Sequence, residues 1–223
     1  MNEATDDLRM RQEKNAVGDG SRPSRVECEK TEVLADAHFR YERLTLRTET
    51  FAGKMSPPYR REVLRSGRAV VVLLYDPVLE KLILIEQFRI GAYVNQLPSP
   101  WILECVAGML DAGETNETTA RREAKEETGC DVGRVEFIGS YLSSPGLLDE
   151  MVSIFVGEVD AARAGGIHGH AGEGEDIRTV IFSVDEALAA MDGGVVVNIM
   201  SQVALLWFAR HREALRRRWL PAG

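Results

Sequence analysis

The chain has 223 residues, 44% of them hydrophobic, and a formal net charge of −8 at pH 7. That length allows one domain of ordinary size with a sizeable core, or one such domain with a short arm. An acidic protein of this kind is a poor general binder of nucleic acid or anionic membrane, so a phosphate-bearing ligand would have to be held by local cations or by a metal ion.

The sequence also argues against membrane insertion and secretion. No apolar run reaches the roughly 18 residues that a membrane span needs. The N-terminus lacks the apolar core of a secretory signal, so we expect the protein in the cytoplasm. Cys28, Cys105 and Cys130 have no metal-ligand spacing, and their odd number fits reduced thiols better than a disulfide framework.

The N-terminal quarter differs in composition from the rest. Residues 1–31 are polar and charged without a periodic apolar pattern, which predicts a disordered leader. In residues 32–58 apolar side chains recur at irregular period-two spacing among threonines, which predicts one or two strands in a small β arm. Ser56-Pro57-Pro58 then breaks the pattern, and we expect the main domain to span residues 59–220.

Three apolar runs follow, each of strand length. Residues 69–75 and 81–87 flank a turn that begins at Asp76-Pro77, so they are expected to pair as an antiparallel hairpin. A third strand, at residues 101–107, leads directly into Gly108. The order of strand, loop and helix suits a site for phosphate and metal.

The stretch from Gly108 to Cys130 reads GMLDAGETNETTARREAKEETGC. Its second half indicates the last turns of a helix closed by a glycine C-cap at Gly129. Glu123, Glu126 and Glu127 fall within an arc of about 100° on one face of that helix. Like charges at i,i+4 cost roughly 0.2–0.5 kcal/mol per pair, and a hard divalent cation such as Mg²⁺, which takes oxygen ligands, is the candidate that offsets this cost.

A merely solvated acidic helix is the alternative interpretation. It gives no reason for a glycine before the loop or for an arginine among the acids. Arg122 lies one turn before Glu126 and can orient that carboxylate as an i,i+4 pair. Arg121 and Lys125 are expected to point the other way, to solvent.

The C-terminal half predicts three more strands. Residues 135–142 and 151–159 are strand candidates separated by Ser143-Ser144-Pro145-Gly146, and residues 179–182 form the last. Between them, residues 165–174 are too polar for core and too long for a tight turn, which predicts a mobile loop.

Two helices end the chain. Ser183 is expected to cap a short helix over 184–191, and Asn198 a longer one that reaches about Trp219. The basic end of the longer helix suits a C-terminus, and because aromatics are not interleaved with it we expect a solvated face there, not a nucleic-acid patch. Strands with helices before and after them predict an α/β/α layered domain.

The helix and the loop before it resemble the Nudix box. The pattern is Gly108, five residues, Glu114, seven residues, Arg122-Glu123, two residues, Glu126-Glu127, one residue, Gly129 and an apolar residue, and every fixed position matches. The resemblance covers about residues 60–210. It implies a Nudix-type α/β/α sandwich with a mixed central sheet, to which the arm is added.

Further stretches are similar to one branch of that family, the bacterial ADP-ribose pyrophosphatases. They are Arg60-Arg61-Glu62, Glu86-Gln87-Phe88-Arg89, Pro100-Trp101, Leu103-Glu104, and Ile167-His168-Gly169 followed by 173–178. Pro145 stands sixteen positions after Gly129, a spacing that in this family marks ADP-ribose hydrolases. One departure is Leu147-Leu148-Asp149 before Glu150, where the branch has small polar residues.

The resemblance implies Mg²⁺-dependent hydrolysis of ADP-ribose to AMP and ribose 5-phosphate, with Mn²⁺ as a possible substitute. Implied metal ligands are the side chains of Glu123 and Glu127, Glu126 through one of the ions, the main-chain oxygen of Ala107, and Glu175 when its loop closes. Glu173 matches the base. A solvated flexible loop is the competing interpretation of the two loop acids.

Substrate contacts are implied at four positions: Arg61, Arg89, Glu150 and Phe39. Arg61 and Arg89 are suited to clamp diphosphate oxygens, and ordinary surface salt bridging is the competitor for each. Phe39 or Tyr41 is a candidate to stack on adenine, with core packing of the arm as the alternative. His168 and His170 are interpreted as loop residues because hard Mg²⁺ prefers oxygen.

The resemblance also implies a homodimer that exchanges the arm at residues 32–58. Two rival functions stay open. One is hydrolysis of GDP-mannose or another nucleoside-diphosphate sugar. The other is a non-hydrolysing nucleotide-sugar sensor, which is disfavoured because such binders often lose box glutamates and none is missing here.

Overall fold

The computed structural model describes residues 22–170, 172 and 174–220. The chain divides into two compact units, each considered by itself. The first comprises the described residues up to Gly67 together with Leu142–Met151, and the second comprises Arg68–Tyr141 and the described residues from Val152 onward. Within the described ranges, no helix is both long and apolar enough to cross a membrane.

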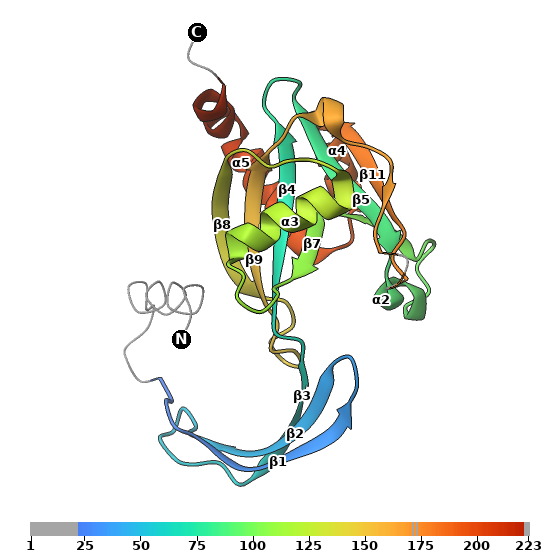
Figure 1. Ribbon diagram of the computed structural model, residues 1–223. Coiled ribbons are helices and arrows are strands. Elements are labelled where there is room, and N and C mark those ends of the chain that lie inside the picture. The colour runs from blue at the N-terminus through green and yellow to red at the C-terminus, as the bar shows by residue number, and fades with distance from the viewer. Residues whose placement is uncertain (1–21, 171, 173, 221–223) are drawn as a thin grey trace. The chain divides into compact units, whose positions relative to one another are not determined.

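The first unit is built on a twisted antiparallel sheet (Figure 1). In its described part the strand order is β1-β2-β3, with β1 at Val26–Asp36, β2 at Arg40–Thr48 and β3 at Tyr59–Arg65. The main chain of Leu64 in β3 also receives the loop at 142–151, donating to the carbonyl of Leu147 and accepting from the amide of Asp149. That loop is therefore held to the sheet by its backbone.

The second unit is a layered α/β domain (Figure 1). Among the described residues, its sheet runs in the order β10-β11-β5-β4-β9-β8, and β6 and β7 pair with β5 and β4. The elements are β4 Arg68–Asp76, β5 Lys81–Phe88, α2 Ile90–Val94, β6 Trp101–Glu104, β7 Val106–Met109, α3 Asn116–Thr128, β8 Val135–Leu142, β9 Met151–Glu158, the 3₁₀ turn η1 Ala161–Arg163, β10 Ile167–His168, β11 Ile177–Ser183, α4 Val184–Asp192 and α5 Ile199–Trp219.

The alternation of side chains along β4 explains the layers. Val71, Leu73 and Tyr75 pack with the residues of α4 and α5, whereas Val70, Val72 and Leu74 pack with Ala120 and Ala124 of α3. A strand whose two faces are both covered has no polar face, which is why this run reads as continuously apolar. The Nudix-type α/β/α expectation is confirmed, and Figure 1 shows α3 crossing one face of the sheet while α5 lies behind it.

The predicted helices and hairpin are confirmed. Strands β4 and β5 pair antiparallel around the turn at Asp76-Pro77. Ser183 caps α4 by accepting from the amide of Glu186, and Asn198 caps α5 by accepting from that of Ser201. Gly129 closes α3 in the left-handed conformation, with φ at 74°.

The single strand predicted at 101–107 is wrong, because two strands meet there. β6 pairs with β5, β7 pairs with β4, and Cys105 between them donates its amide to Ser201 Oγ at 2.9 Å. Between β6 and β7, the hydroxyl of Ser201 in α5 thus accepts the backbone hydrogen bond that a neighbouring strand would otherwise accept. An apolar run in sequence carries no sign of such a break.

Other boundaries also differ from expectation. β1 begins at Val26, before the expected start of the arm at 32, and β3 belongs to the same sheet. The helix α2 was not predicted, since only Ala92 of its five residues is buried and no apolar period arises. The expected loop at 165–174 contains the two-residue strand β10. Most of the predicted leader, residues 1–21, lies outside the described residues, and the division at 1–31, 32–58 and 59–220 stays a prediction.

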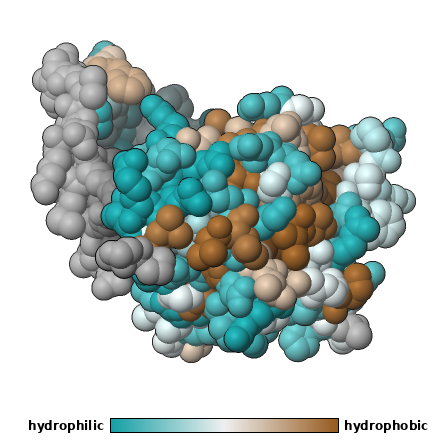
Figure 2. Space-filling model, turned by 90° about the horizontal axis from the view of Figure 1, so that it is seen from above, coloured by the Kyte–Doolittle hydropathy of each residue, from teal (hydrophilic) through white to brown (hydrophobic). Residues whose placement is uncertain are grey.

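Apolar side chains also reach the surface. Figure 2 shows hydrophobic residues gathered in a patch that is ringed by hydrophilic ones. Phe88, Tyr93 and Trp101 are among the exposed large side chains, and the Phe88 ring lies 5.8 Å from that of Trp101 and 6.1 Å from that of Tyr93, between centroids. Surface of this kind is typical of association or ligand binding.

Candidate metal and diphosphate site

The site begins where β7 runs past the helix α3. A Cβ atom at Gly108 would lie 1.8 Å from Oε1 of Glu123, so only glycine lets that carboxylate lie against the strand. Helix α3 is fixed at its start by a capping box between Thr115 and Thr118 and at its end by Gly129. The strand and the helix therefore hold Glu123 at one place.

Glu127 lies one turn further along α3 and is 5% exposed. Its Oε2 accepts a hydrogen bond from the Ala107 amide at 3.2 Å. Burial raises the pKa of Glu127 to about 8, the Ala107 amide and the charge of Arg89 oppose the rise, and the charges of Glu123 and Glu104 add to it. The hydrogen bond from Ala107 orients the Glu127 carboxyl group, but burial makes its ionisation unfavourable unless a cation is bound.

Glu123 is under the same constraint. Burial raises its pKa to about 7, Arg122 opposes the rise, and the charges of Glu126 and Glu175 add to it. Two neighbouring carboxylates with raised pKa values are typical of functional sites. A bound cation would remove the cost of ionising both.

Arg122 ties the acids of this site together. Its Nη1 donates to Glu123 Oε1 at 2.8 Å and to Glu126 Oε2 at 2.9 Å, and its Nε donates to Glu114 Oε1 at 2.9 Å. The hydrogen bond from Arg122, followed by that from Thr119, lowers the pKa of Glu114 to about 2. The predicted pairing of Arg122 with Glu126 is confirmed, and the contacts to Glu114 and Glu123 extend it.

Arg121 and Lys125 point away from this cluster, as expected. Arg121 pairs with Glu117 at 2.8 Å and donates to the carbonyl of Gly133, and Lys125 pairs with Asp131 at 2.9 Å. Neither side chain therefore competes with Arg122 for the acids of the site.

The donor set fits a hard cation. Its atoms are carboxylate and carbonyl oxygens, the ligands that Mg²⁺ prefers. As they stand, no three His, Cys, Asp or Glu side chains in the described part of the chain are arranged to hold an ion. Arg122 Nη1 instead bonds one oxygen of Glu123 and one of Glu126. An incoming ion would have to take these oxygens from the guanidinium.

Of the acidic loop, Glu175 lies among the described residues. The charge of Glu175 acts on Glu123, and the Glu175 amide donates to the carbonyl of His170 at 3.2 Å. His168 was interpreted as a loop residue, but it lies in the two-residue strand β10, and its Nε2 bonds the carbonyl of Gly165 at 2.8 Å. Glu173, the predicted base, lies outside the described residues.

Arg89 directly follows β5 and belongs to the same unit. Its guanidinium pairs with the carboxylate of Glu104, which is only 1% exposed, with Nη2 at 2.5 Å from Oε1. Arg89 therefore makes a salt bridge, to a buried partner, and its charge acts on Glu127. Its contact with diphosphate stays a prediction.

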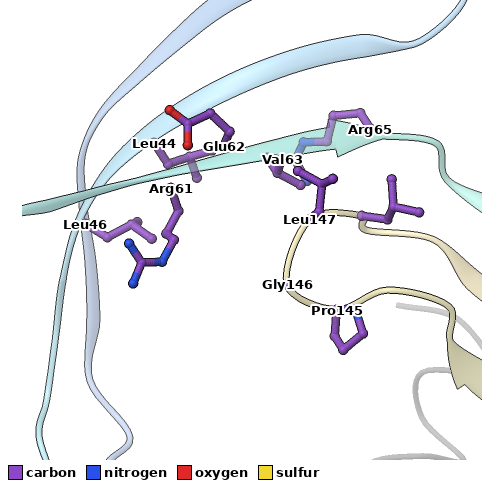
Figure 3. Close-up of a pocket in the computed structure, with 10 residues that line it drawn as sticks. Leu44, Leu46, Arg61, Glu62, Val63, Arg65, Pro145, Gly146 and Leu147 are labelled. Carbon is purple, nitrogen blue, oxygen red and sulfur yellow. The ribbon is translucent and has the colours of Figure 1, made fainter. Parts of the chain in front are cut away.

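The other predicted substrate contacts belong to the first unit. Arg61 stacks on Tyr59, with its Cζ 4.7 Å from the ring centroid. Arg61 and Pro145 both line a cavity of about 360 Å³ (Figure 3). The rest of the lining is Leu44, Leu46, Glu62, Val63, Arg65, Gly146, Leu147 and Leu148.

Glu150 and Phe39 are the two remaining predicted contacts of the first unit. Glu150 accepts from the Ser143 amide through its main-chain oxygen at 3.3 Å. Phe39 follows β1, is 37% exposed and lies edge-on to His38 at 4.4 Å between ring centroids. Their roles toward substrate stay predictions.

Two acidic residues of these units were not predicted to have a role. Asp149 accepts from the amides of Ser66 and Gly67 at 2.8 and 3.2 Å and from Arg65 Nη1 at 3.1 Å, which fixes the loop that carries Pro145. Glu104 is the other. A carboxylate inside the apolar run Trp101-Ile-Leu-Glu-Cys-Val was a usable signal, because a buried charge needs partners.

Comparison with known proteins agrees with the geometry. An ADP-ribose pyrophosphatase of Escherichia coli (strain K12) is 44% identical over 194 residues, which cover 87% of this chain and 92% of that protein. One from Haemophilus influenzae is 37% identical over 84% of this chain and 88% of that protein. A GDP-mannose pyrophosphatase of Cronobacter sakazakii is 34% identical over 77% of this chain and 88% of that protein.

The fold is also found among solved structures. The crystal structure of an ADP compounds hydrolase has a TM-score of 0.65 and 20% identity, and the match covers 88% of this chain and 97% of that one. Residues 65–199, which include the whole acidic helix, match the NUDIX domain. The chain belongs to the NUDIX family.

Proposed function

We propose that this protein hydrolyses the diphosphate bond of ADP-ribose, with Mg²⁺, to AMP and ribose 5-phosphate. The observation that carries the proposal is the close contact of the Glu123 carboxylate with Gly108, next to the buried Glu127. Relatives named ADP-ribose pyrophosphatase, up to 44% identical over most of the chain, support the choice of substrate.

The Mg²⁺ ion would be bound by oxygen atoms of this chain. Glu123 and Glu127 are the proposed ligands, joined by the Ala107 main-chain oxygen, Glu126 and, from the loop, Glu175. When bound, Mg²⁺ neutralises diphosphate charge and lowers the pKa of water. Mn²⁺ has the same preference for oxygen ligands and is a proposed substitute.

The remaining roles fall to side chains that orient substrate or move a proton. Arg89 and Arg61 offer guanidinium donors to diphosphate oxygens, and Glu150 and Phe39 are proposed contacts for the rest of the substrate. Glu173 is the proposed base that takes a proton from the attacking water. A base on a loop acts once loop closure has excluded bulk water.

Hydrolysis of GDP-mannose is the second candidate function. It is favoured by relatives named GDP-mannose pyrophosphatase at 34% identity, which is lower than the 44% found for the first group. Because the metal site serves any nucleoside-diphosphate sugar, the choice depends on contacts outside the acidic helix.

A substrate panel separates these functions. The purified protein is incubated with Mg²⁺ and ADP-ribose, GDP-mannose or another nucleoside-diphosphate sugar, and the released nucleotide is measured. We expect AMP from ADP-ribose at a rate at least about tenfold above GMP from GDP-mannose, and no product with EDTA. Preferred release of GMP would favour the second function, and tight binding of ADP-ribose without any product would indicate a sensor.

We further propose a cytoplasmic homodimer that exchanges the arm at residues 32–58, which exposes Val33 and Leu34 on β1 and Phe39 after it. Apolar side chains on a strand exposed to water favour association with another surface. Sedimentation of the full chain should then give about twice the mass of 24.7 kDa. A single species of 24.7 kDa at micromolar concentration would rule out the exchange.

A further inference from the structure

Glu104 is a carboxylate in the interior of the second unit, 1% exposed, at the end of β6. Its Oε1 accepts from Gln87 Nε2 at 2.9 Å and from Arg89 Nε at 2.6 Å. Its Oε2 accepts from Asn198 Nδ2 at 2.8 Å. Partners from two parts of the chain, the end of β5 and the start of α5, thus converge on one buried carboxylate, which is the kind of partnering that a buried charge requires.

The contact with Arg89 uses one edge of the guanidinium. Glu104 Oε1 lies against Nε and Nη2, the latter at 2.5 Å. A guanidinium carries five N–H donors in one plane, so the outer edge, with Nη1 and the second Nη2 hydrogen, keeps its donors. The Arg89 side chain as a whole is 41% exposed, so solvent reaches it.

Asn198 determines the direction of its hydrogen bond with Glu104. Its Oδ1 accepts from the Ser201 amide at 3.0 Å as the N-cap of α5, so its Nδ2 must be the donor to Glu104. Glu104 accepts there and from Gln87, which fits the ionised carboxylate. The residue that caps α5 therefore also holds one oxygen of Glu104, at the end of β6.

Stability alone is a weak explanation for this arrangement. Replacing a buried ion pair with apolar residues of similar volume is often neutral or stabilising. Arg89 also lies close enough to the acidic helix for its charge to act on Glu127. A guanidinium whose inner edge is bonded has lost freedom before a ligand arrives, which lowers the entropy cost of binding.

We propose that Glu104 is a positioning residue for the substrate: it bonds the inner edge of Arg89 and thereby presents the outer edge, as two parallel N–H donors, to a diphosphate. The proposal rests on the proposed function, in which Arg89 binds the diphosphate. Lysine in place of Arg89 cannot perform both tasks, because an ammonium has no second edge.

Binding of ADP-ribose in EDTA, measured by calorimetry, tests the proposal without turnover. Glu104→Gln keeps the side-chain volume, removes the charge, and turns an NH₂ group toward existing donors. We expect its dissociation constant to rise about tenfold, as does that of Arg89→Ala. The double variant should bind within about twofold of Arg89→Ala, because Glu104 acts through Arg89. Glu136→Gln, which breaks the surface pair with Arg218, should bind like the wild type.

Additive losses in the double variant, or wild-type affinity in Glu104→Gln, would overturn the proposal. If circular dichroism shows that Glu104→Gln does not fold, Asn198→Ser carries the same test. Serine keeps the cap of α5 and removes only the donor to Glu104, so it should weaken binding in the wild type and not in Arg89→Ala.

Steady-state kinetics test the role of Glu104 separately from the proposed hydrolysis of ADP-ribose. With Mg²⁺, Glu104→Gln should raise KM about tenfold while kcat changes less than about threefold. A wild type that releases no AMP contradicts the proposed function. An active wild type with additive variants contradicts only the role of Glu104.

Discussion

At the scale of single residues, Gly108 makes the sharpest test, because its missing side chain leaves room for Glu123. A Cβ there would lie 1.8 Å from Glu123 Oε1, the flexible end of a side chain. Gly108→Ala should therefore displace the carboxylate without moving backbone. We expect Mg²⁺ affinity to fall about tenfold or more, and the free energy of unfolding to change by less than about 1 kcal/mol.

Calorimetric titration and urea unfolding measure the two effects separately. Gly91→Ala is the matched control, since a Cβ there meets nothing within 4 Å and its backbone is not left-handed. Unchanged Mg²⁺ affinity in Gly108→Ala would show that Glu123 does not need its seat on the strand.

The pKa values of two glutamates predict an unusual pH dependence. Burial raises the pKa of Glu123 to about 7 and that of Glu127 to about 8, from an ordinary value of 4.5 in the unfolded chain. The metal-free folded protein therefore binds more protons than the unfolded chain within this interval. Its stability is fully present below 4.5 and is lost as pH rises through 7 and 8.

Urea unfolding in EDTA at about pH 6 and about pH 8 checks the sign. We expect the free energy of unfolding to be lower at the higher pH by roughly 1–3 kcal/mol, and most of the difference to disappear in Glu127→Gln. Saturating Mg²⁺ should reduce it as well, because the ion binds the ionised carboxylates. Equal stability at both pH values in EDTA would mean that neither carboxyl is protonated in the fold.

Glu173→Gln tests the proposed base. Glutamine keeps the shape and removes the proton acceptor, so turnover should fall by about two to four orders of magnitude. The affinity for ADP-ribose should survive, since no binding contact is removed. Steady-state kinetics and calorimetry give the two quantities, and turnover like that of the wild type would remove Glu173 from the role.

Sequence pattern was a good guide to the residues of the acidic helix and a poor one beyond it. The pairing of Arg122 with Glu126 follows from helical spacing alone. Its contacts with Glu114 and the bonds of Asp149 to Ser66 and Gly67 join separate elements, and no periodicity encodes such pairs.

At the scale of elements, the chain between β6 and β7 is held to α5 by one hydroxyl group. Ser201 Oγ accepts the Cys105 amide at 2.9 Å inside the core. Ser201→Ala leaves that amide unpaired, and we expect a loss of about 1–3 kcal/mol in the free energy of unfolding. Thermal or urea unfolding measures it.

Ser143→Ala provides the comparison for that loss. Within the described residues its Oγ is buried and has no hydrogen-bond partner, so removal should be neutral or slightly stabilising. If both variants are equally stable, the amide of Cys105 has found another acceptor and Ser201 does not hold the chain between β6 and β7.

Element boundaries that are set by nearby residues were predicted from the sequence, and those that are set by distant residues were not. The caps Ser183 and Asn198 and the C-cap Gly129 act within a turn of their helices, and each was predicted. The break at Cys105 arises from a residue of α5 that is distant in sequence. The helix α2 exposes Ile90, Tyr93 and Val94, which leaves no pattern to recognise.

At the scale of the whole molecule, the layered fold was predictable because both faces of β4 are covered. A strand with apolar side chains on both faces requires a helix layer on each. The order β10-β11-β5-β4-β9-β8 in the described sheet was not predictable, since pairing among distant strands is decided by packing. The same limit applies to residues 26–31, which read as a leader and form the start of β1.

The central claim is that Glu123 and Glu127 hold a divalent cation that binds a diphosphate. Titration of the protein with Mn²⁺ in the presence of ADP-ribose, followed by electron paramagnetic resonance, tests it directly. We expect an ion bound by the wild type, and affinity at least about a hundredfold weaker in the Glu123→Gln, Glu127→Gln double variant. Equal Mn²⁺ binding by the wild type and the double variant, or none by either, would contradict the claim.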